Sequence, residues 1–173
     1  RAPVGQQRLQ SVELLLQQND DEPRRYTVTR GVVPIQHTFH ERVDREGKAI
    51  EVIRFDRITP ATVSDLRKIE QEWTSPPDAV LLDLQRDSHD LHHGVLLADA
   101  LLDGGTIGRV VTADESRSFE AGREALFGDL PLFVMVSGTT SGTLEWVAAA
   151  LQDQGRASIV GQQTAGQPFV SES

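Results

Sequence analysis

The residues that offer the clearest chemistry lie in a short turn after an apolar run. Met135–Glu145 (MVSGTTSGTLE) joins the end of an expected strand to the start of an expected helix through small hydroxyl and glycine residues. Such a turn can present a serine beside free backbone N–H groups and the positive end of a helix dipole, as a nucleophilic serine requires. Ser141 is therefore the candidate nucleophile. The alternative is that Thr140 or Ser141 only caps the helix, because Ser and Thr are preferred at that position.

A second group of reactive side chains follows another apolar run. Asp87–His93 (DSHDLHH) holds three histidines and two aspartates in seven residues. Such side chains can bind a metal such as zinc or nickel, and a histidine can act as a general base near neutral pH. The alternative is a solvated surface loop with no special partner. His37 and His40 should lie on a strand and face opposite sides, so they are not expected to share a metal.

Composition limits the remaining possibilities. The only lysines are Lys48 and Lys68, so no lysine base follows Ser141 within this chain. The chain has no cysteine, which excludes disulfides and cysteine-ligated metals. Its 26 acidic and 17 basic residues give a net charge of −9, which disfavours nucleic-acid binding. No apolar run reaches the roughly 18 residues that a membrane span needs.

The elements that must position these residues alternate between helix and strand after residue 50. Apolar residues at helical spacing predict helices that begin at Thr59-Pro60 and that cover Gly94–Leu102 and Gly142–Gln152. Apolar runs predict strands at 79–84, 107–112, 131–136 and 157–160. The strands at 79–84 and 131–136 should be covered on both faces, and the polar residues 113–128 should form a surface excursion. Because parallel strands need crossover connections, the pattern predicts an α/β domain with a parallel or mixed sheet.

The N-terminal part of the chain has the pattern of β structure. Ser11–Leu16 and Arg25–Thr29 predict a hairpin around a stretch of turn-forming residues. A second hairpin is expected from Val32–Val43 and Ala49–Asp56, with a Glu-Gly turn between its arms.

Several of these segments together resemble one family, the C-terminal processing (tail-specific) serine peptidases. Glu145–Gly166 (EWVAAALQDQGRASIVGQQTAG) is similar to the family's helix, its ALQD-x-GRA stretch, the following strand and its G-x-x-T-x-G motif. The run AVLLDL resembles the family's LILDLR strand. The N-terminal RAPVG, a β-hairpin and then TVTRGVV resemble the end of a PDZ domain running into the catalytic domain. The resemblance covers most of the chain.

The resemblance implies a fold, an activity and a location. The fold would be a ClpP/crotonase-like α/β sheet with covering helices. Residues 1–30 would be the C-terminal strands of a PDZ-like module, and residues 31–173 would be the core domain. The activity would be cleavage of protein substrates at or near their C-termini by a Ser–Lys dyad, with no metal or other cofactor. A PDZ domain would capture the substrate tail, and the location would be extracytoplasmic, in the bacterial periplasm or cell envelope.

Carried over residue by residue, the family's active site is incomplete in this chain. Gly142 falls at the nucleophile position and Ser141 lies one residue early, although a one-residue insertion at 143 or 144 would bring Ser141 into register. Gln167 occupies the position of the catalytic lysine. A carboxamide has no basic lone pair at relevant pH, so it cannot take a proton from serine. Asp153 matches an aspartate that many members carry in the helix.

The loop that supplies the family's oxyanion donors also differs. The family has Asn-x-x-Gly-Gly after its LDLR strand, whereas this chain has RDSHDLHHG, with Gln85 for the usual arginine and Gly94 only at the end. Side chains at those positions would hinder the close backbone approach that glycine permits. Loss of one oxyanion donor costs about 2.7–4 kcal/mol of transition-state stabilisation.

We therefore expect a domain of this family with a degenerate catalytic site and weak or no hydrolytic activity. One alternative is a Ser–His pair, in which His92 or His93 replaces the lysine as base for Ser141. A second is a non-catalytic peptide-binding module that retains the family's groove. A third is a metal-binding or ligand-binding domain at the histidine cluster.

Overall fold

The computed structural model describes residues 11–17, 22–29, 31, 35–112 and 114–169. Contacts divide the chain into two units, Arg1–Ile35 and Gln36–Ser173. In the first unit, β1 (Ser11–Leu16) and β2 (Arg24–Thr29) pair antiparallel and confirm the predicted hairpin. All described residues of both strands are exposed. The RAPVG segment lies outside the described residues, and the PDZ origin of this unit stays a prediction, as does the boundary at residue 30.

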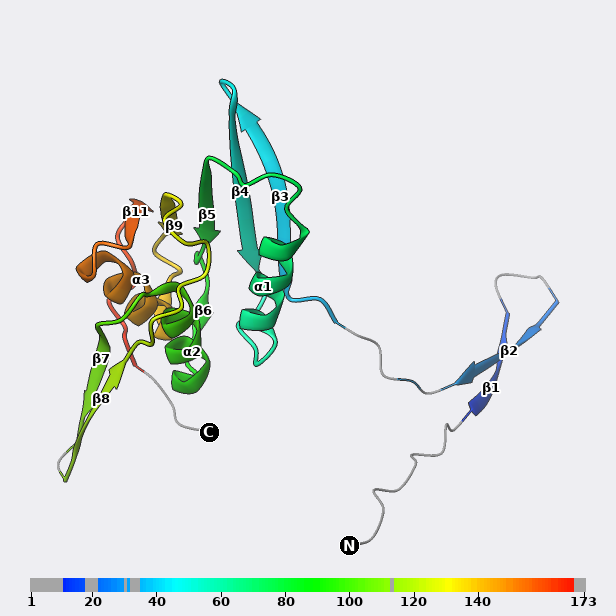
Figure 1. Ribbon diagram of the computed structural model, residues 1–173. Coiled ribbons are helices and arrows are strands. Elements are labelled where there is room, and N and C mark those ends of the chain that lie inside the picture. The colour runs from blue at the N-terminus through cyan, green and yellow to red at the C-terminus, as the bar shows by residue number, and fades with distance from the viewer. Residues whose placement is uncertain (1–10, 18–21, 30, 32–34, 113, 170–173) are drawn as a thin grey trace, which may run out of the picture. The chain divides into compact units, whose positions relative to one another are not determined.

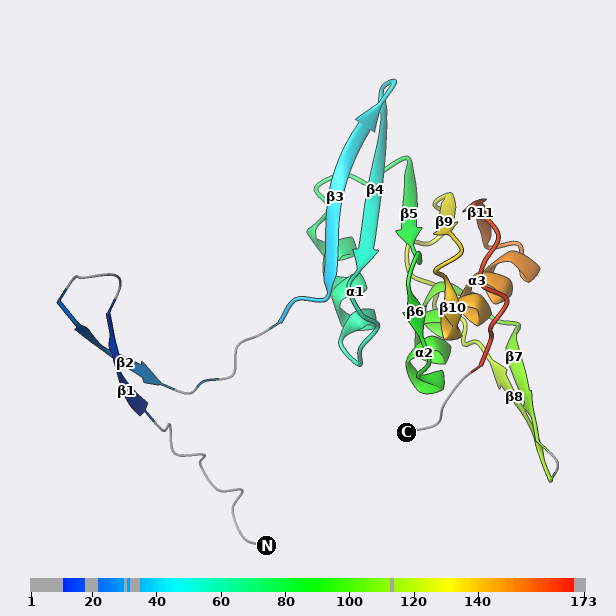
Figure 2. The ribbon, with the colours of Figure 1, turned by 180° about the vertical axis from the view of Figure 1, so that it is seen from behind.

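The second unit is built on a five-stranded sheet with the order β11-β9-β5-β4-β3 (Figure 1). Its strands are β3 (Thr38–Arg45), β4 (Lys48–Phe55), β5 (Ala79–Asp83), β9 (Leu132–Val136) and β11 (Ala157–Gly161). Only β3 runs antiparallel to its neighbour, which confirms the predicted mixed sheet. The β3–β4 hairpin is longer than the other strands, and its tip extends beyond them (Figure 2). Both tip residues, Glu46 and Gly47, have positive φ, as two-residue hairpin turns require.

The described helices pack on one face of this sheet. They are α1 (Thr62–Glu72), α2 (Leu91–Leu101) and α3 (Thr143–Asp153). Sheet residues such as Ile53, Leu82 and Val134 are fully buried and share one core with side chains of all three helices. The residues that alternate with these along the strands, such as Leu81 and Phe133, are only partly buried and lie outside that core. The prediction that β5 and β9 are covered on both faces is therefore wrong within the described chain. An apolar run shows that both faces are apolar, but it does not show that a layer covers each of them.

Two helix starts differ from the sequence prediction. α1 begins at Thr62, because a turn closed by the hydroxyls of Thr59 and Thr62 precedes it. α2 begins at Leu91, three residues before the predicted Gly94, because the Asp90 side chain caps it by accepting from the backbone N–H of His93 at 2.9 Å. None of the described helices combines the length and apolar character that a membrane span requires.

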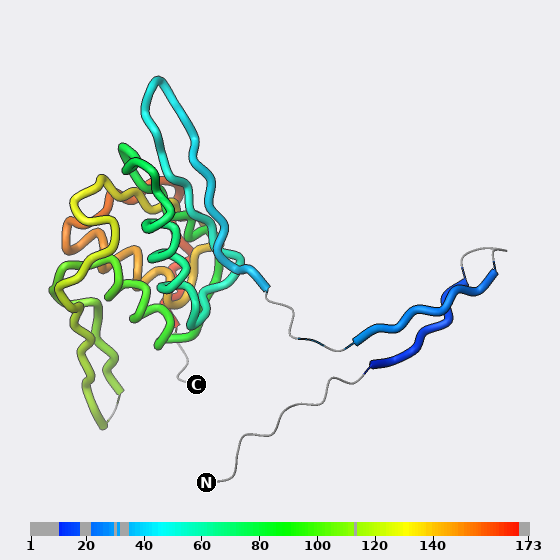
Figure 3. Tube along the Cα trace, turned by 45° about the vertical axis from the view of Figure 1, so that its right-hand side comes forward, coloured from blue at the N-terminus to red at the C-terminus, as the bar shows by residue number. Residues whose placement is uncertain are grey.

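The predicted surface excursion at 113–128 is wrong in part. Ser116–Glu120 forms strand β8, which pairs antiparallel with β7 (Thr106–Val111), and Leu126 and Phe127 are buried in the core. β8 has a single apolar residue, Phe119, so no apolar periodicity marks this strand in the sequence. The β7–β8 hairpin projects from the opposite end of the unit to the β3–β4 tip (Figure 3).

Arg156, just after α3, joins three segments that enclose the core. Its guanidinium donates hydrogen bonds to the backbone carbonyls of Leu101 (3.2 Å), Leu130 (3.0 Å) and Leu126 (3.3 Å). Burial lowers the pKa of this guanidinium, while the charge of Asp129 acts in the opposite direction. The planar guanidinium thus donates to carbonyls at the end of α2 and in the segment before β9. The single ammonium group of a lysine could not reach all of these carbonyls at once.

Arg156→Lys should lower the free energy of unfolding by about 2 kcal/mol, because it leaves buried carbonyls without donors. Urea denaturation measures this difference. The matched control is Arg123→Lys, at an exposed arginine, which should change stability by less than about 0.5 kcal/mol. Equal effects at the two positions would contradict the role given to Arg156.

Candidate active site

The candidate site lies where three loops leave the carboxyl ends of parallel strands β5, β9 and β11. Ligands commonly bind at this edge of an α/β sheet. The loops are residues 84–90, 137–142 and 162–168. Two short strands, β6 (Asp87–Ser88) and β10 (Ser141–Gly142), pair in parallel between the first two loops. The turn that the sequence singled out therefore faces the loop that carries His89.

Thr140 holds the three loops together. It is fully buried, and its hydroxyl donates to the carbonyl of Leu84 at 2.8 Å and accepts from the N–H of Ser137 at 3.0 Å. Its own carbonyl accepts from the N–H of Ala165 at 3.0 Å. Thr139 adds a second link, because its hydroxyl donates to the carbonyl of Gln85 at 3.0 Å. Two hydroxyls of the turn are thus structural.

Ser141 is the hydroxyl that remains available for ligands. The residue is 8% exposed, and its backbone N–H donates to the carbonyl of Arg86 at 3.2 Å. Within the described residues its hydroxyl has no hydrogen-bond partner, and Ser141 lines a cleft of about 540 Å³. The capping alternative is wrong, because Gly142 occupies the N-cap of α3 and no side chain caps that helix.

Gly142 lies in close contact with the loop that carries Ser88 and His89. Its φ is +64°, and its N–H donates to the carbonyl of Gln167 at 2.9 Å. A Cβ atom at this position would collide with the carbonyl oxygen of Ser88 and with Nδ1 of His89. Positive φ already strains any residue with a side chain. The structure therefore has no room for a side chain at Gly142.

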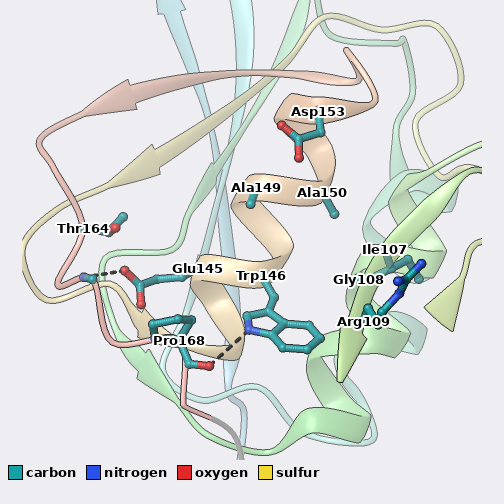
Figure 4. A pocket seen from close by; sticks show the side chains of 11 residues that line it. Ile107, Gly108, Arg109, Glu145, Trp146, Ala149, Ala150, Asp153, Thr164 and Pro168 are labelled. Atoms are coloured by element: carbon teal, nitrogen blue, oxygen red, sulfur yellow. Dashed lines mark hydrogen bonds between the residues drawn. The ribbon is translucent and has the colours of Figure 1, made fainter. Parts of the chain in front are cut away.

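The first turn of α3 fixes the segment that carries Gln167. The Glu145 carboxylate accepts from the backbone N–H of Gly166 at 2.7 Å and from that of Gln167 at 2.8 Å. The indole N–H of Trp146 donates to the carbonyl of Pro168 at 3.2 Å (Figure 4). Sequence reasoning missed this role of Glu145. The available signal was an acidic residue in the first turn of a helix, where the helix dipole favours it.

The structure brings Ser141 and Gln167 together, since both line the same cleft. His92 and His93 lie instead in the first turn of α2, where His93 contacts the capping Asp90 at 3.4 Å. Neither imidazole is hydrogen-bonded to Ser141 among the residues that the structure describes, and the Ser–His pair stays a prediction. Asp153 lies at the end of α3 and lines a separate pocket of about 430 Å³ between α3 and β7 (Figure 4).

The histidine cluster forms no metal centre in the described chain. No three histidine, aspartate or glutamate side chains of residues 11–169, as far as these are described, lie close enough together to hold a metal ion. The capping role of Asp90 accounts for one acidic residue of the DSHDLHH motif. Gly94, which directly follows the motif, lies inside α2. A Cβ there would lie 2.5 Å from Cβ of Thr143, so Gly94 permits the close contact of α2 with α3.

Glu145→Gln should loosen the segment that carries Gln167. A carboxamide has one acceptor oxygen and no charge, so it cannot accept from both backbone N–H groups as strongly. Amide hydrogen exchange at Gly166 and Gln167 should accelerate about tenfold, as loss of about 1.4 kcal/mol of local stability implies. Glu124→Gln, at an exposed acidic residue, is the control. Unchanged exchange at both amides would show that Glu145 does not hold the segment.

Comparison with known proteins agrees with this geometry. The model of peptidase family S41 matches residues 50–173. A carboxyl-terminal-processing protease of Picosynechococcus sp. is 29% identical over 87% of this chain and 37% of that protein. Another, from Synechocystis sp., is 28% identical over 90% of this chain and 37% of that protein.

A solved structure shows the same fold. The photosystem II D1 C-terminal processing protease superposes with a TM-score of 0.67 at 21% identity, over 91% of this chain and 45% of that one. The present chain spans a little over a third of the length of the curated relatives it matches. Because the family model covers most of the chain, including every loop of the candidate site, the chain belongs to peptidase family S41.

Proposed function

We propose that this domain holds segments of protein chains in the cleft beside Ser141 and Gln167 without hydrolysing them. The observation that carries the proposal is the backbone at Gly142, which stands at the family's nucleophile position and leaves no space for a side chain. A hydrolytic serine needs its hydroxyl at that position, next to a base. Here the segment with the Ser88 carbonyl and the His89 ring fills the space instead.

The neighbouring loop supports the same conclusion. If the family's Asn-x-x-Gly-Gly motif follows its strand directly, its glycines correspond to His89 and Asp90 in this chain. The His89 ring lies against the position that a side chain of residue 142 would take. The Asp90 side chain is engaged as the cap of α2. Both positions thus carry side chains where glycine would allow a reacting carbonyl to approach the backbone.

The family's lysine base is replaced as well. Gln167 stands at the lysine position, and its carboxamide cannot accept a proton from a hydroxyl. The hydroxyl of Ser141 has no hydrogen-bonded base among the described residues. Loss of the general base alone lowers hydrolytic rates by several orders of magnitude. The combined loss of base and nucleophile position therefore argues for binding and against turnover.

The cleft itself remains suitable for a peptide. It measures about 540 Å³ and is open at the carboxyl edge of the sheet. Polar side chains at Gln85, Ser141 and Gln167 line it and have hydrogen-bonding capacity for a peptide backbone. The relatives are named as carboxyl-terminal-processing proteases, so we infer that the bound segments belong to protein tails.

We further infer that the first unit, with β1 and β2, comes from a PDZ-type module and that residues 31–173 form the core domain. The resemblance of RAPVG, the hairpin and TVTRGVV to the end of a PDZ domain supports this inference. We propose an extracytoplasmic location on the family resemblance alone.

Peptide binding without shortening tests the proposed function. A set of unstructured decapeptides should bind in fluorescence anisotropy and remain intact by mass spectrometry after a day at 25 °C. An active family member should shorten the same peptides and serves as the positive control. Shortened products that disappear in Ser141→Ala would contradict the proposal, and so would a complete lack of binding.

Gly142→Ala should destabilise the domain more than an equivalent change at an open glycine. Positive φ costs about 1–3 kcal/mol for a residue with a side chain, and the collision with the Ser88 carbonyl adds to it. Gly155→Ala is the matched control, because Gly155 also has positive φ (+67°) but nothing within 4 Å of a Cβ. Urea denaturation should show a loss at Gly142 that exceeds the loss at Gly155 by at least about 1 kcal/mol. Equal losses would show that the cleft has room at Gly142.

A further inference from the structure

Arg86 is the one basic residue among those that line the cleft at Ser141 in the described chain. Its backbone is fixed on both sides. Its N–H donates to the carbonyl of Leu84 at 2.7 Å, and its carbonyl accepts from the N–H of Ser141 at 3.2 Å. Its guanidinium makes no ion pair or hydrogen bond with any described residue. The backbone of Arg86 is thus fixed beside Ser141, and its guanidinium has no partner among the described residues that would compete for a ligand.

Ser141 provides a second, independent observation. It is more than nine-tenths buried, yet its hydroxyl has no partner among the described residues. A hydroxyl at a cleft wall that has no protein partner is left to water, and a ligand group can take the place of that water. Because Ser141 lines the cleft, a ligand in the cleft can supply the missing partner. The ligand group must accept hydrogen bonds from both a guanidinium and a hydroxyl.

We propose that Arg86 and the hydroxyl of Ser141 bind a carboxylate of the captured peptide. This inference rests on the proposed function and adds the chemical group that the cleft selects. A guanidinium presents two parallel N–H donors that match the two oxygens of a carboxylate. The serine hydroxyl donates one further hydrogen bond to the same group. Ser141 thereby acts as a donor to the ligand and not as a nucleophile.

The negative charge of Asp87 opposes carboxylate binding, so a change at this residue provides a further test. It lines the same cleft, and its Cα lies opposite that of Ser141 in the β6–β10 pair. The charges of Arg86 and Asp87 cancel, and the whole chain carries −9, so no general attraction draws anions to the cleft. Carboxylate binding must therefore depend on direct contact with Arg86, and removal of the Asp87 charge should strengthen it.

The carboxylate has two sources in a peptide, the C-terminus and an acidic side chain. Three fluorescein-labelled decapeptides of serine, alanine and leucine distinguish them. The first has a free C-terminal carboxylate, the second has a C-terminal amide, and the third has the amide and one internal glutamate. Dissociation constants are measured by anisotropy at low ionic strength, where charge contacts are least screened.

The wild-type domain should bind the free-carboxylate peptide about tenfold more tightly than the plain amide, as a charge-assisted contact implies. Arg86→Gln should reduce this ratio to about one, whereas Asp87→Asn should increase it. Ser141→Ala should lower it by a smaller factor, and Arg123→Gln should leave it unchanged. Tight binding of the glutamate peptide would also support the proposal and would assign the carboxylate to a side chain.

The outcomes separate this inference from the proposed function. Equal binding of all three peptides by the wild type would overturn the inference and leave peptide binding intact. An unchanged ratio in Arg86→Gln, with thermal unfolding like that of the wild type, would overturn it as well. Binding of none of the peptides would overturn both proposals together.

Discussion

The chemistry of this domain depends on one backbone contact, in which Gly142 lies directly against the carbonyl of Ser88. Two further constraints keep it there, namely the β6–β10 pairing and the hydrogen bond from Gly142 to the carbonyl of Gln167. Because the Ser88 carbonyl and the His89 ring occupy the space that a Cβ atom would need, residue 142 cannot carry a hydroxyl. Among the described residues that line the cleft, the hydroxyl without a partner is that of the preceding residue, Ser141.

The rest of the turn serves to keep this arrangement rigid. Thr139 and Thr140 use their hydroxyls as links to the loop after β5, and Glu145 holds the backbone of the segment at Gln167. The loops around the cleft are therefore preorganised, although we propose that glycine stands at the family's nucleophile position. Preorganisation lowers the entropic cost of binding, so a rigid cleft without a base is suited to holding a peptide. The same framework fits our proposal of an S41 fold that is retained in a domain without hydrolytic activity.

Much of the fold could be predicted from the sequence, because apolar periodicity reports which residues face a core. This periodicity predicted the mixed sheet and the turn that precedes α3. It did not predict the start of α2, because Asp90 is at once a helix cap and one of the two aspartates in a histidine-rich motif. The roles of Arg156, Glu145 and Gly142 depend on carbonyls and amides more than 20 residues away, or on close approach of another loop. Such contacts leave no local pattern in a single sequence.

Covalent labelling of the cleft hydroxyl tests the central claim most directly, that no activated nucleophile remains in the site. The domain is incubated with a serine-directed fluorophosphonate, and the adduct is located by mass spectrometry, with an active family member treated in parallel. We predict labelling of the active member and no adduct on this domain under the same conditions. A single adduct on Ser141 that is lost in Ser141→Ala would contradict the account.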